Sequence, residues 1–294
     1  MKTIKSNIKF IWRVSIKYTE IFLAIVGFIG LFAPLNDVFS DEISLNKKVV
    51  ISCLVVLGIW LIIFIISCFY IYKKRYYKIF YTGNGHYVYV QYGDVLSPDG
   101  IKKTEARNVA IAVNRCFDTI IDDELIAKRS LHGIVMEKLY ANHIYTQEEL
   151  DSDIQRQLTK RKVKYETIES DDKPRGNLKR YEPGTVVEIL GEEGVTYFFL
   201  ALASLDDSLH AHVSDDEYVM ALIKMLVYIN KRSQGRPLFM PLIGAGQSDT
   251  KKNERDILEY LVKLLKLNRN LINCDVHIVV YQSNKVNISI AGLE

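Results

Sequence analysis

The 294-residue chain contains only four cysteines, and their spacing excludes several kinds of site. Cys53 and Cys68 lie in an apolar N-terminal block, whereas Cys116 and Cys274 lie far apart in the remainder. No CxxC pair occurs, so the sequence has neither zinc-ligand spacing nor the framework of a disulfide-stabilised domain. We expect four small, mostly buried side chains, with the C-terminal part in a reducing cytosol.

An excess of charge of one sign is also missing. The chain has 38 Lys and Arg against 35 Asp and Glu, whereas general nucleic-acid binding usually needs a clear basic excess. No Walker A loop, GxSxG elbow or HExxH helix occurs. Asp118, Asp122 and Asp123 fit no metal loop, and His210 and His212 lack a third ligand, so we predict no metal site and no nucleic-acid partner.

A long apolar run at 49–72 is the strongest feature that is present, and it contains no charged residue. A bilayer core needs about 20 apolar residues in a helix, so this run predicts a membrane span. A shorter run at about 18–35 predicts another, with Glu20 at the interface because a carboxylate in mid-bilayer is costly. A signal peptide is the alternative, but no small-x-small cleavage site follows Leu35. An interfacial aromatic belt is expected at Tyr70, Tyr72, Tyr76 and Tyr77.

The distribution of lysine and arginine predicts the orientation of these spans. Basic residues precede the first span within 2–17 and follow the second within 73–78, while the connecting loop at 36–48 carries three acids and two lysines. Positive flanks stay inside, so both termini are expected in the cytoplasm, with a lipid bilayer as a partner. Two helices cannot enclose a pore, so any pore requires self-association.

The sequence therefore divides into a transmembrane hairpin at 1–80 and a cytoplasmic domain at 81–294. In the second part, strands alternate with helices around one central hairpin, which predicts an α/β fold with a mixed sheet. A polar insertion at about 146–183 ends in a stretch without periodicity, 166–183, expected to be an exposed, mobile loop. Strands are predicted at 87–92, 108–113, 185–190, 195–203, 238–243 and 276–281, and helices at 131–141, 215–232 and 253–267.

Two loops precede predicted helices, and helix N-termini bind anions through free backbone amides. Together they can hold the two phosphates of a diphosphate, although the glycine loop also fits a plain tight turn, and His132 also fits a surface position. The loop residues that we expect at a ligand are Ser130, Leu131, His132, Gly133, Gly244, Ala245, Gly246, Gln247 and Ser248.

Polar residues also follow two predicted strands, where α/β sheets bind ligands. Asp94, with its neighbour Val95, comes just after the first strand, where a carboxylate can accept a hydrogen bond from an adenine amine. An Asx turn that closes the strand is the alternative. Asn114 ends the second strand and can bind a ribose hydroxyl.

The order of these features resembles a macro domain over about 81–294. The resemblance is carried by Tyr92-Gly93-Asp94-Val95, by Ala112-Val113-Asn114, by the hairpin, and by Met240-Pro241-Leu242-Ile243-Gly244-Ala245-Gly246. It implies a three-layer sandwich that binds adenine at Asp94, ribose at Asn114 and a diphosphate at Gly244, Ala245 and Gly246. Hydrolytic macro domains carry a second Asn where this chain has Phe117, and a glycine-rich loop where it has 122–130. The resemblance therefore implies binding without catalysis.

Two membrane spans before a divergent macro domain resemble the membrane effectors of Thoeris-type bacterial anti-phage systems. In that family, a partner TIR-domain enzyme turns NAD into an ADP-ribose derivative, for this architecture an amino-acid conjugate. The resemblance implies an effector in the bacterial inner membrane that senses this signal, oligomerises, disrupts the membrane and causes abortive infection. No other cofactor is implied. The alternatives are a membrane-anchored ADP-ribosyl hydrolase, a non-catalytic ADP-ribose reader, and a structural anchor that binds only protein.

Overall fold

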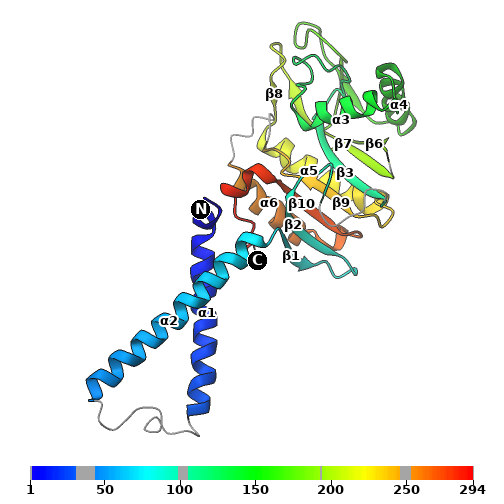
Figure 1. Ribbon diagram of the computed structural model, residues 1–294. Coiled ribbons are helices and arrows are strands. Elements are labelled where there is room, and N and C mark those ends of the chain that lie inside the picture. The colour runs from blue at the N-terminus through cyan, green and yellow to red at the C-terminus, as the bar shows by residue number, and fades with distance from the viewer. Residues whose placement is uncertain (1, 31–43, 99–104, 193, 246–252, 294) are drawn as a thin grey trace. The chain divides into compact units, whose positions relative to one another are not determined.

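The computed structural model describes residues 2–30, 44–98, 105–192, 194–245 and 253–293 (Figure 1). The chain divides into two compact units, which we describe separately. The first contains Met1–Arg75 together with Ser283–Gly292, and the second contains Tyr76–Gln282 together with Leu293–Glu294.

The first unit is built on two helices of 29 residues each, α1 (Lys2–Gly30) and α2 (Leu45–Lys73). Among the described residues, α2 is the one helix long and apolar enough to cross a membrane, over Asn46–Lys73. Helix α1 begins far upstream of the expected span at 18–35, and residues 31–35 lie outside the described part of the chain. One membrane-compatible helix is therefore found, and the two-span hairpin stays a prediction.

The two helices contact each other along an aromatic cluster. The rings of Trp12 and Trp60 meet edge to face with centroids 4.9 Å apart, and Phe64 adjoins both. On α1, the hydroxyls of Ser15 and Thr19 are buried and donate to carbonyl oxygens one turn earlier in the helix. Their polar groups are thus satisfied within α1 itself.

The second unit is a mixed sheet in the order β1-β2-β10-β9-β3-β7-β6, with the short β8 paired to β7. The five strands from β2 to β7 in this order run parallel, and β1 and β6 are antiparallel to their neighbours. The predicted mixed α/β sheet is confirmed. The strands are β1 (Tyr76–Tyr81), β2 (Tyr87–Gly93), β3 (Arg107–Asn114), β6 (Val186–Leu190), β7 (Val195–Leu205), β8 (Ala211–His212), β9 (Leu238–Pro241) and β10 (Val276–Tyr281).

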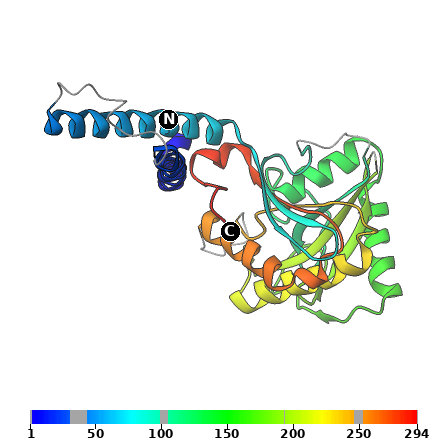
Figure 2. The same ribbon diagram turned by 90° about the horizontal axis from the view of Figure 1, so that it is seen from below.

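Helices cover both faces of this sheet (Figure 2). On one face lie α3 (Leu131–Ala141) and α4 (Gln147–Lys160), and on the other lie α5 (Asp215–Arg232) and α6 (Glu254–Leu267). Since both faces are covered, the parallel strands are near-continuous apolar runs, and all of β7 from Val195 to Ala203 is buried. A short 3₁₀ turn, η2 (Arg269–Leu271), follows α6.

Strand β1 is an element that the sequence does not predict. Tyr76 and Tyr77, expected in an interfacial aromatic belt, instead pair with Gln91 and Val90 of β2. The ring of Tyr76 stacks on Tyr89 at 4.9 Å between centroids. The aromatic residues after the basic cluster therefore build the sheet edge of the second unit.

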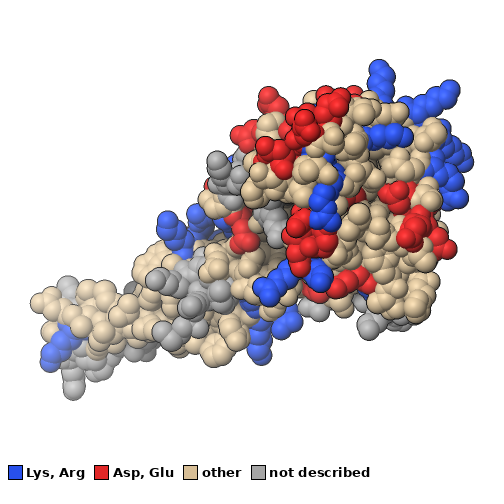
Figure 3. Space-filling model, turned by 90° about the horizontal axis from the view of Figure 1, so that it is seen from above, with Lys and Arg blue, Asp and Glu red and all other residues tan. Residues whose placement is uncertain are grey.

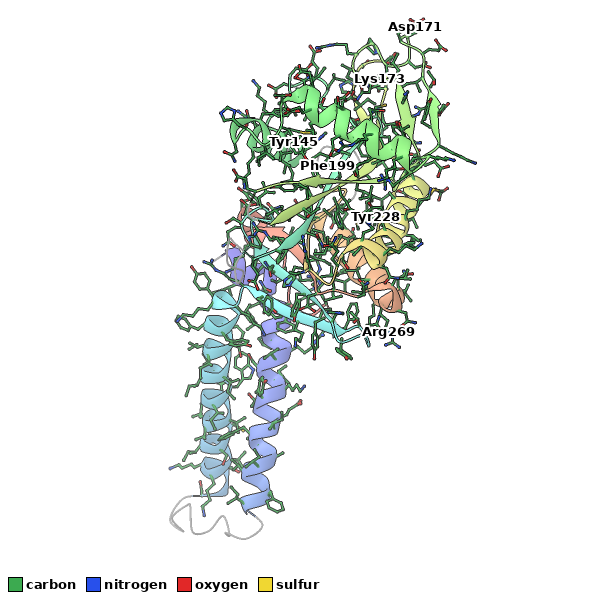
Figure 4. All side chains as sticks on the ribbon, turned by 90° about the vertical axis from the view of Figure 1, so that its right-hand side faces the viewer. Tyr145, Asp171, Lys173, Phe199, Tyr228 and Arg269 are labelled. Atoms are coloured by element: carbon green, nitrogen blue, oxygen red, sulfur yellow. The ribbon has the colours of Figure 1, made fainter. Side chains whose placement is uncertain are left out.

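Residues 166–183 are mostly exposed, as expected, but the expectation of an irregular loop is wrong. Strands β4 (Tyr165–Thr167) and β5 (Lys179–Tyr181) pair with each other, and the segment between them returns a lysine to the interior. Lys173 is fully buried, and its Nζ lies 3.0 Å from Oδ2 of Asp118, while exposed Asp171 marks the outer tip (Figure 4). Asp118 is buried as well, with 1% of its surface exposed. Charge spacing in one dimension cannot reveal a pair formed across 55 residues.

Candidate functional site

The carboxyl ends of β3, β7 and β9 surround a cavity of about 220 Å³ in the second unit. Because these three strands are parallel, the loops that follow them meet at one edge of the sheet. Asn114 at the end of β3, Ser130, Leu131 and His132 at the start of α3, and Gly244 after β9 all line the cavity. Residues from three predicted segments thus share one hollow.

The start of α3 supplies backbone amides to this cavity. Ser130 is the N-cap: its Oγ accepts a hydrogen bond from the amide of Gly133 at 3.0 Å and donates to the carbonyl of Ala127 at 2.7 Å. The first bond to a main-chain carbonyl is made by Ile134, so the amides of Leu131 and His132 precede it. Such amides, with the partial positive charge of the helix end, suit an anionic group.

Gly133 does not line the cavity, and the structure gives it a different role. A Cβ at this position would lie 2.3 Å from the carbonyl oxygen of Ala127. The glycine therefore lets the first turn of α3 lie against the preceding loop. A ligand contact at Gly133 stays a prediction.

His132 is buried, so the alternative of a surface position is wrong. Its ring meets Phe199 of β7 edge to face at 5.8 Å between centroids. Burial disfavours the charged imidazolium and lowers the pKa of His132 to about 3. The cavity is therefore lined by a neutral imidazole at physiological pH.

The loop after β9 brings its backbone to the cavity at Ile243 and Gly244. Gly244 has a φ of +90°, a conformation that costs a residue with a side chain extra free energy. The hydroxyl of Tyr218 on α5 donates to the carbonyl oxygen of Ile243 at 2.7 Å. Ala245 closes the turn through its amide, 3.0 Å from the carbonyl of Leu242. The predicted contacts Gly246, Gln247 and Ser248 lie outside the described residues.

Asn114 is held in place by the turn that follows it. Its Oδ1 accepts hydrogen bonds from the amides of Cys116 at 3.1 Å and Asp118 at 3.3 Å. A side-chain hydrogen bond from Asn114 also favours the charged form of Asp118, so the turn after β3 fixes the orientation of Asn114 at the edge of the cavity.

Asp94 and Val95 lie at the same edge but do not line the cavity. Strand β10 separates β2 from β9, and its register aligns Tyr92 with Val280 and Pro241 with Val279. Asp94 and the Gly244 turn therefore follow strand ends at one level. Oδ1 of exposed Asp94 accepts from the amide of Leu96 at 2.9 Å, which is the Asx turn that we kept as an alternative. Its adenine contact stays a prediction.

Sequence reasoning missed the first turn of α5, which connects the loops of the site. Glu217 accepts from Nη1 of Arg115 at 2.6 Å, next to Asn114, and the following residue, Tyr218, holds Ile243. The guanidinium of Arg115 also donates from Nε to the carbonyl of Tyr181 at 2.8 Å. No sequence motif predicts these hydrogen bonds, because each joins residues more than 20 positions apart.

A larger hollow lies away from these residues, between α4, β6 and α5, with a volume of about 1410 Å³. There Glu188 accepts hydrogen bonds from Tyr228 and Arg232, and these outweigh the effect of burial and lower its pKa. Gln157 bonds both the amide and the carbonyl of Glu188, so α4 seals the sheet edge. We assign the ligand site to the smaller cavity, because strand ends and helix amides converge there.

The comparison with known families decides the class of this domain. The model of the macro domain of the Thoeris protein ThsA matches residues 88–281. This chain belongs to the ThsA macro-domain family. The match begins within β2 and ends with the last residue of β10, so it contains every strand of the main sheet except β1.

A curated member supports this assignment. The Thoeris protein ThsA of Bacillus amyloliquefaciens (strain Y2) is 27% identical over 163 residues, which are 55% of this chain and 50% of that protein. The chain thus spans about half the length of that relative. A crystal structure of a protein from Bacteroides thetaiotaomicron shares 13% identity over 65% of this chain and 96% of its own, with a TM-score of 0.36.

Proposed function

We propose that this chain is the effector of a bacterial Thoeris anti-phage system and senses an ADP-ribose-derived signal through its macro domain. The observation that carries the proposal is the cavity at the carboxyl edge, where Asn114, the amides of α3 and the Gly244 turn meet. A TIR-domain enzyme is the proposed source of the signal, an amino-acid conjugate of ADP-ribose being the form that we favour. The membership in the ThsA macro-domain family supports this assignment.

The chemistry of the cavity suits a diphosphate beside a ribose. Helix amides and a glycine turn with positive φ bind phosphate oxygens without a basic side chain. The neutral ring of His132 and its apolar surroundings suit the uncharged part of the ligand. Complete ligand pockets usually measure about 300–1,000 Å³, so a cavity of about 220 Å³ accommodates only part of a dinucleotide-like molecule. The remainder extends along the sheet edge towards Asp94.

The first unit supplies the proposed output. Helix α2 has the length and composition of a membrane span, and we propose that α1 adds a second one, with both termini in the cytoplasm of the inner membrane. We propose that ligand binding then favours self-association of several chains. A pore would need helices from more than one chain, because two helices alone enclose none. Disruption of the membrane and abortive infection follow.

A tethered ADP-ribosyl hydrolase is the second candidate. The position where hydrolytic relatives are expected to carry a second Asn holds Phe117, which is 1% exposed and lies in the hydrophobic core. An apolar core side chain positions no water. We therefore propose binding without turnover.

The experiment is titration calorimetry of the full chain in detergent micelles. ADP-ribose and an amino-acid conjugate of ADP-ribose are the ligands, and AMP is the reference. Gly244→Ala should weaken binding, while Gly235→Ala, which has φ +70° in an open loop remote from the cavity, should leave it unchanged. Both variants carry a similar backbone penalty of about 1–2 kcal/mol, so a difference between them reports on the site.

Two results would contradict the proposal. One is the absence of measurable heat with every ADP-ribose derivative. The other is equal affinity of both glycine variants for the ligand. Release of free ADP-ribose from a modified protein would instead favour the hydrolase.

A further inference from the structure

Residues 283–292, here called the strap, continue the last strand of the sheet but belong to the first unit. Strand β10 ends at Tyr281, and the strap begins within the 3₁₀ turn η3 (Gln282–Val286) that follows it. The chain thus passes from the first unit to the sheet between α2 and β1, and returns to the first unit between β10 and the strap.

The strap caps the end of α2. Nζ of Lys285 donates to the carbonyl oxygen of Tyr72 at 2.9 Å and lies 5.4 Å from the centre of its ring. Carbonyls in the last turn of a helix lack partners within the helix, and a cation there is favoured by the helix dipole. Burial and the charge of Arg75 lower the pKa of Lys285, as expected for an ammonium group partly withdrawn from water.

The strap also packs on the start of α1. The hydroxyl of Ser289 donates to Oδ1 of Asn7, which is 3% exposed. Gly292 has a φ of +69°, and a Cβ there would lie 3.1 Å from the ring of Phe10. Ile288 and Ile290 are buried. Both helices of the first unit are therefore held by a segment of ten residues.

The other end of the strap begins at the proposed ligand edge. Strand β10 lies between β2, which leads to Asp94, and β9, which leads to Gly244. The register pairs Tyr281 with Gly93, so the last residue of β10 stands level with the residue before Asp94. A ligand that reaches both Asp94 and the Gly244 turn must cross the end of β10, where the strap starts.

We infer that the strap transmits occupancy of the ligand site to α1 and α2. The inference rests on the proposed function and adds the element through which binding reaches the membrane helices. A ligand shifts a conformational equilibrium only by its differential affinity for the two states. A ligand that crosses the end of β10 favours the state in which that end, and the strap attached to it, fit the ligand. When the strap changes its conformation, its contacts with the end of α2 and with α1 change as well.

The test compares two double variants of the full chain. Lys285→Met with Ser289→Ala removes the contact of Lys285 with Tyr72 and that of Ser289 with Asn7. Lys266→Met with Ser152→Ala makes the same chemical changes at exposed positions on α6 and α4. Calorimetry in micelles measures the affinity for the amino-acid conjugate of ADP-ribose, and dye release from phosphatidylethanolamine–phosphatidylglycerol vesicles measures the membrane effect of the same ligand.

We expect the strap variant to bind the ligand with unchanged affinity but to release dye at least about tenfold more slowly than the wild type. The control variant should match the wild type in both measurements. A short glycine insertion after Gln282, which slackens the link and leaves the strap sequence intact, should give the same result. Wild-type dye release by both strap variants would overturn the inference, and so would a parallel loss of binding. If the wild type neither binds the ligand nor releases dye in response to it, the proposed function itself fails.

Discussion

Replacing Tyr218 with phenylalanine tests whether α5 holds the glycine turn in its binding conformation. The hydroxyl of Tyr218 donates to the carbonyl of Ile243 at 2.7 Å, and both residues are at most 2% exposed. Burial raises the pKa of this phenol, so it remains a donor throughout the physiological range. Phenylalanine keeps the ring and removes the donor, which leaves a buried carbonyl next to Gly244 without this hydrogen bond.

The magnitude follows from that buried carbonyl. A net hydrogen bond contributes about 0.5–1.5 kcal/mol, and a buried unsatisfied group costs about 1–3 kcal/mol. We expect Tyr218→Phe to lose about 1–3 kcal/mol of stability and, because the turn is then no longer fixed, to bind the ADP-ribose derivative about tenfold more weakly. Thermal unfolding and calorimetry of the full chain in micelles measure the two quantities.

Tyr228→Phe is the matched control on the same helix (Figure 4). Its hydroxyl donates to Glu188 at 2.7 Å, outside the cavity. This variant should lose comparable stability and keep full affinity. If Tyr218→Phe binds as tightly as the wild type, or if Tyr228→Phe weakens binding as much, α5 does not position the turn.

Three further outcomes are expected from unfolding of the full chain in micelles. Lys173→Met leaves the buried carboxylate of Asp118 unpaired and should lower the free energy of unfolding by about 3–5 kcal/mol. Adding Asp118→Asn should recover most of this loss, whereas additive losses in the double variant would contradict the pairing. Since the folded pKa of His132 is about 3 and its ordinary value is 6.5, the unfolded chain takes up the proton first. Stability should therefore fall below pH 6.5 by about 1.4 kcal/mol per pH unit from this residue, and His132→Phe should flatten that slope. Gly133→Ala should lose about 1–3 kcal/mol from overlap with Ala127, and a neutral result would exclude the close packing.

The sheet could be predicted because its central strands are buried on both faces. Runs such as 109–113 and 197–203 contain no charged residue and no polar residue other than Tyr197, and amphipathic helices follow later in the chain. The start of the helix at Asp215 could also be predicted from the sequence, because Ser214 and Glu217 have the spacing of a capping box, which the structure contains. In contrast, β1 carries lysine and tyrosine beside a basic cluster, a composition that fits an edge strand and a membrane interface equally well.

The site could be predicted where its residues follow a strand or begin a helix, as Ser130, Leu131 and His132 do. Asn114 ends β3 and Gly244 lies in the loop after β9, which ends at Pro241, so the parallel topology brings them to one edge. The contacts that fix them depend on pairs distant in sequence, and Tyr218 reads as an ordinary core residue of an amphipathic helix. The near-neutral composition is visible on the surface, because both acidic and basic side chains lie on the face seen in Figure 3.

The insertion and the departure from the hydrolase pattern have a common structural basis. Phe117 has a φ of +53°, and its ring meets Tyr181 of β5 edge to face at 5.7 Å between centroids. The side chain of Asn177, within the insertion, donates to the carbonyl of Phe117 at 3.3 Å. The segment around β5 therefore covers the corner where a hydrolytic relative is expected to present its second Asn. Asparagine at position 117 would place an amide against this apolar packing and cost stability without reaching the cavity. The packing that orders 165–181 thus agrees with the proposal that the domain binds its ligand without turnover, and we expect Phe117→Asn alone to release no ADP-ribose from a modified protein.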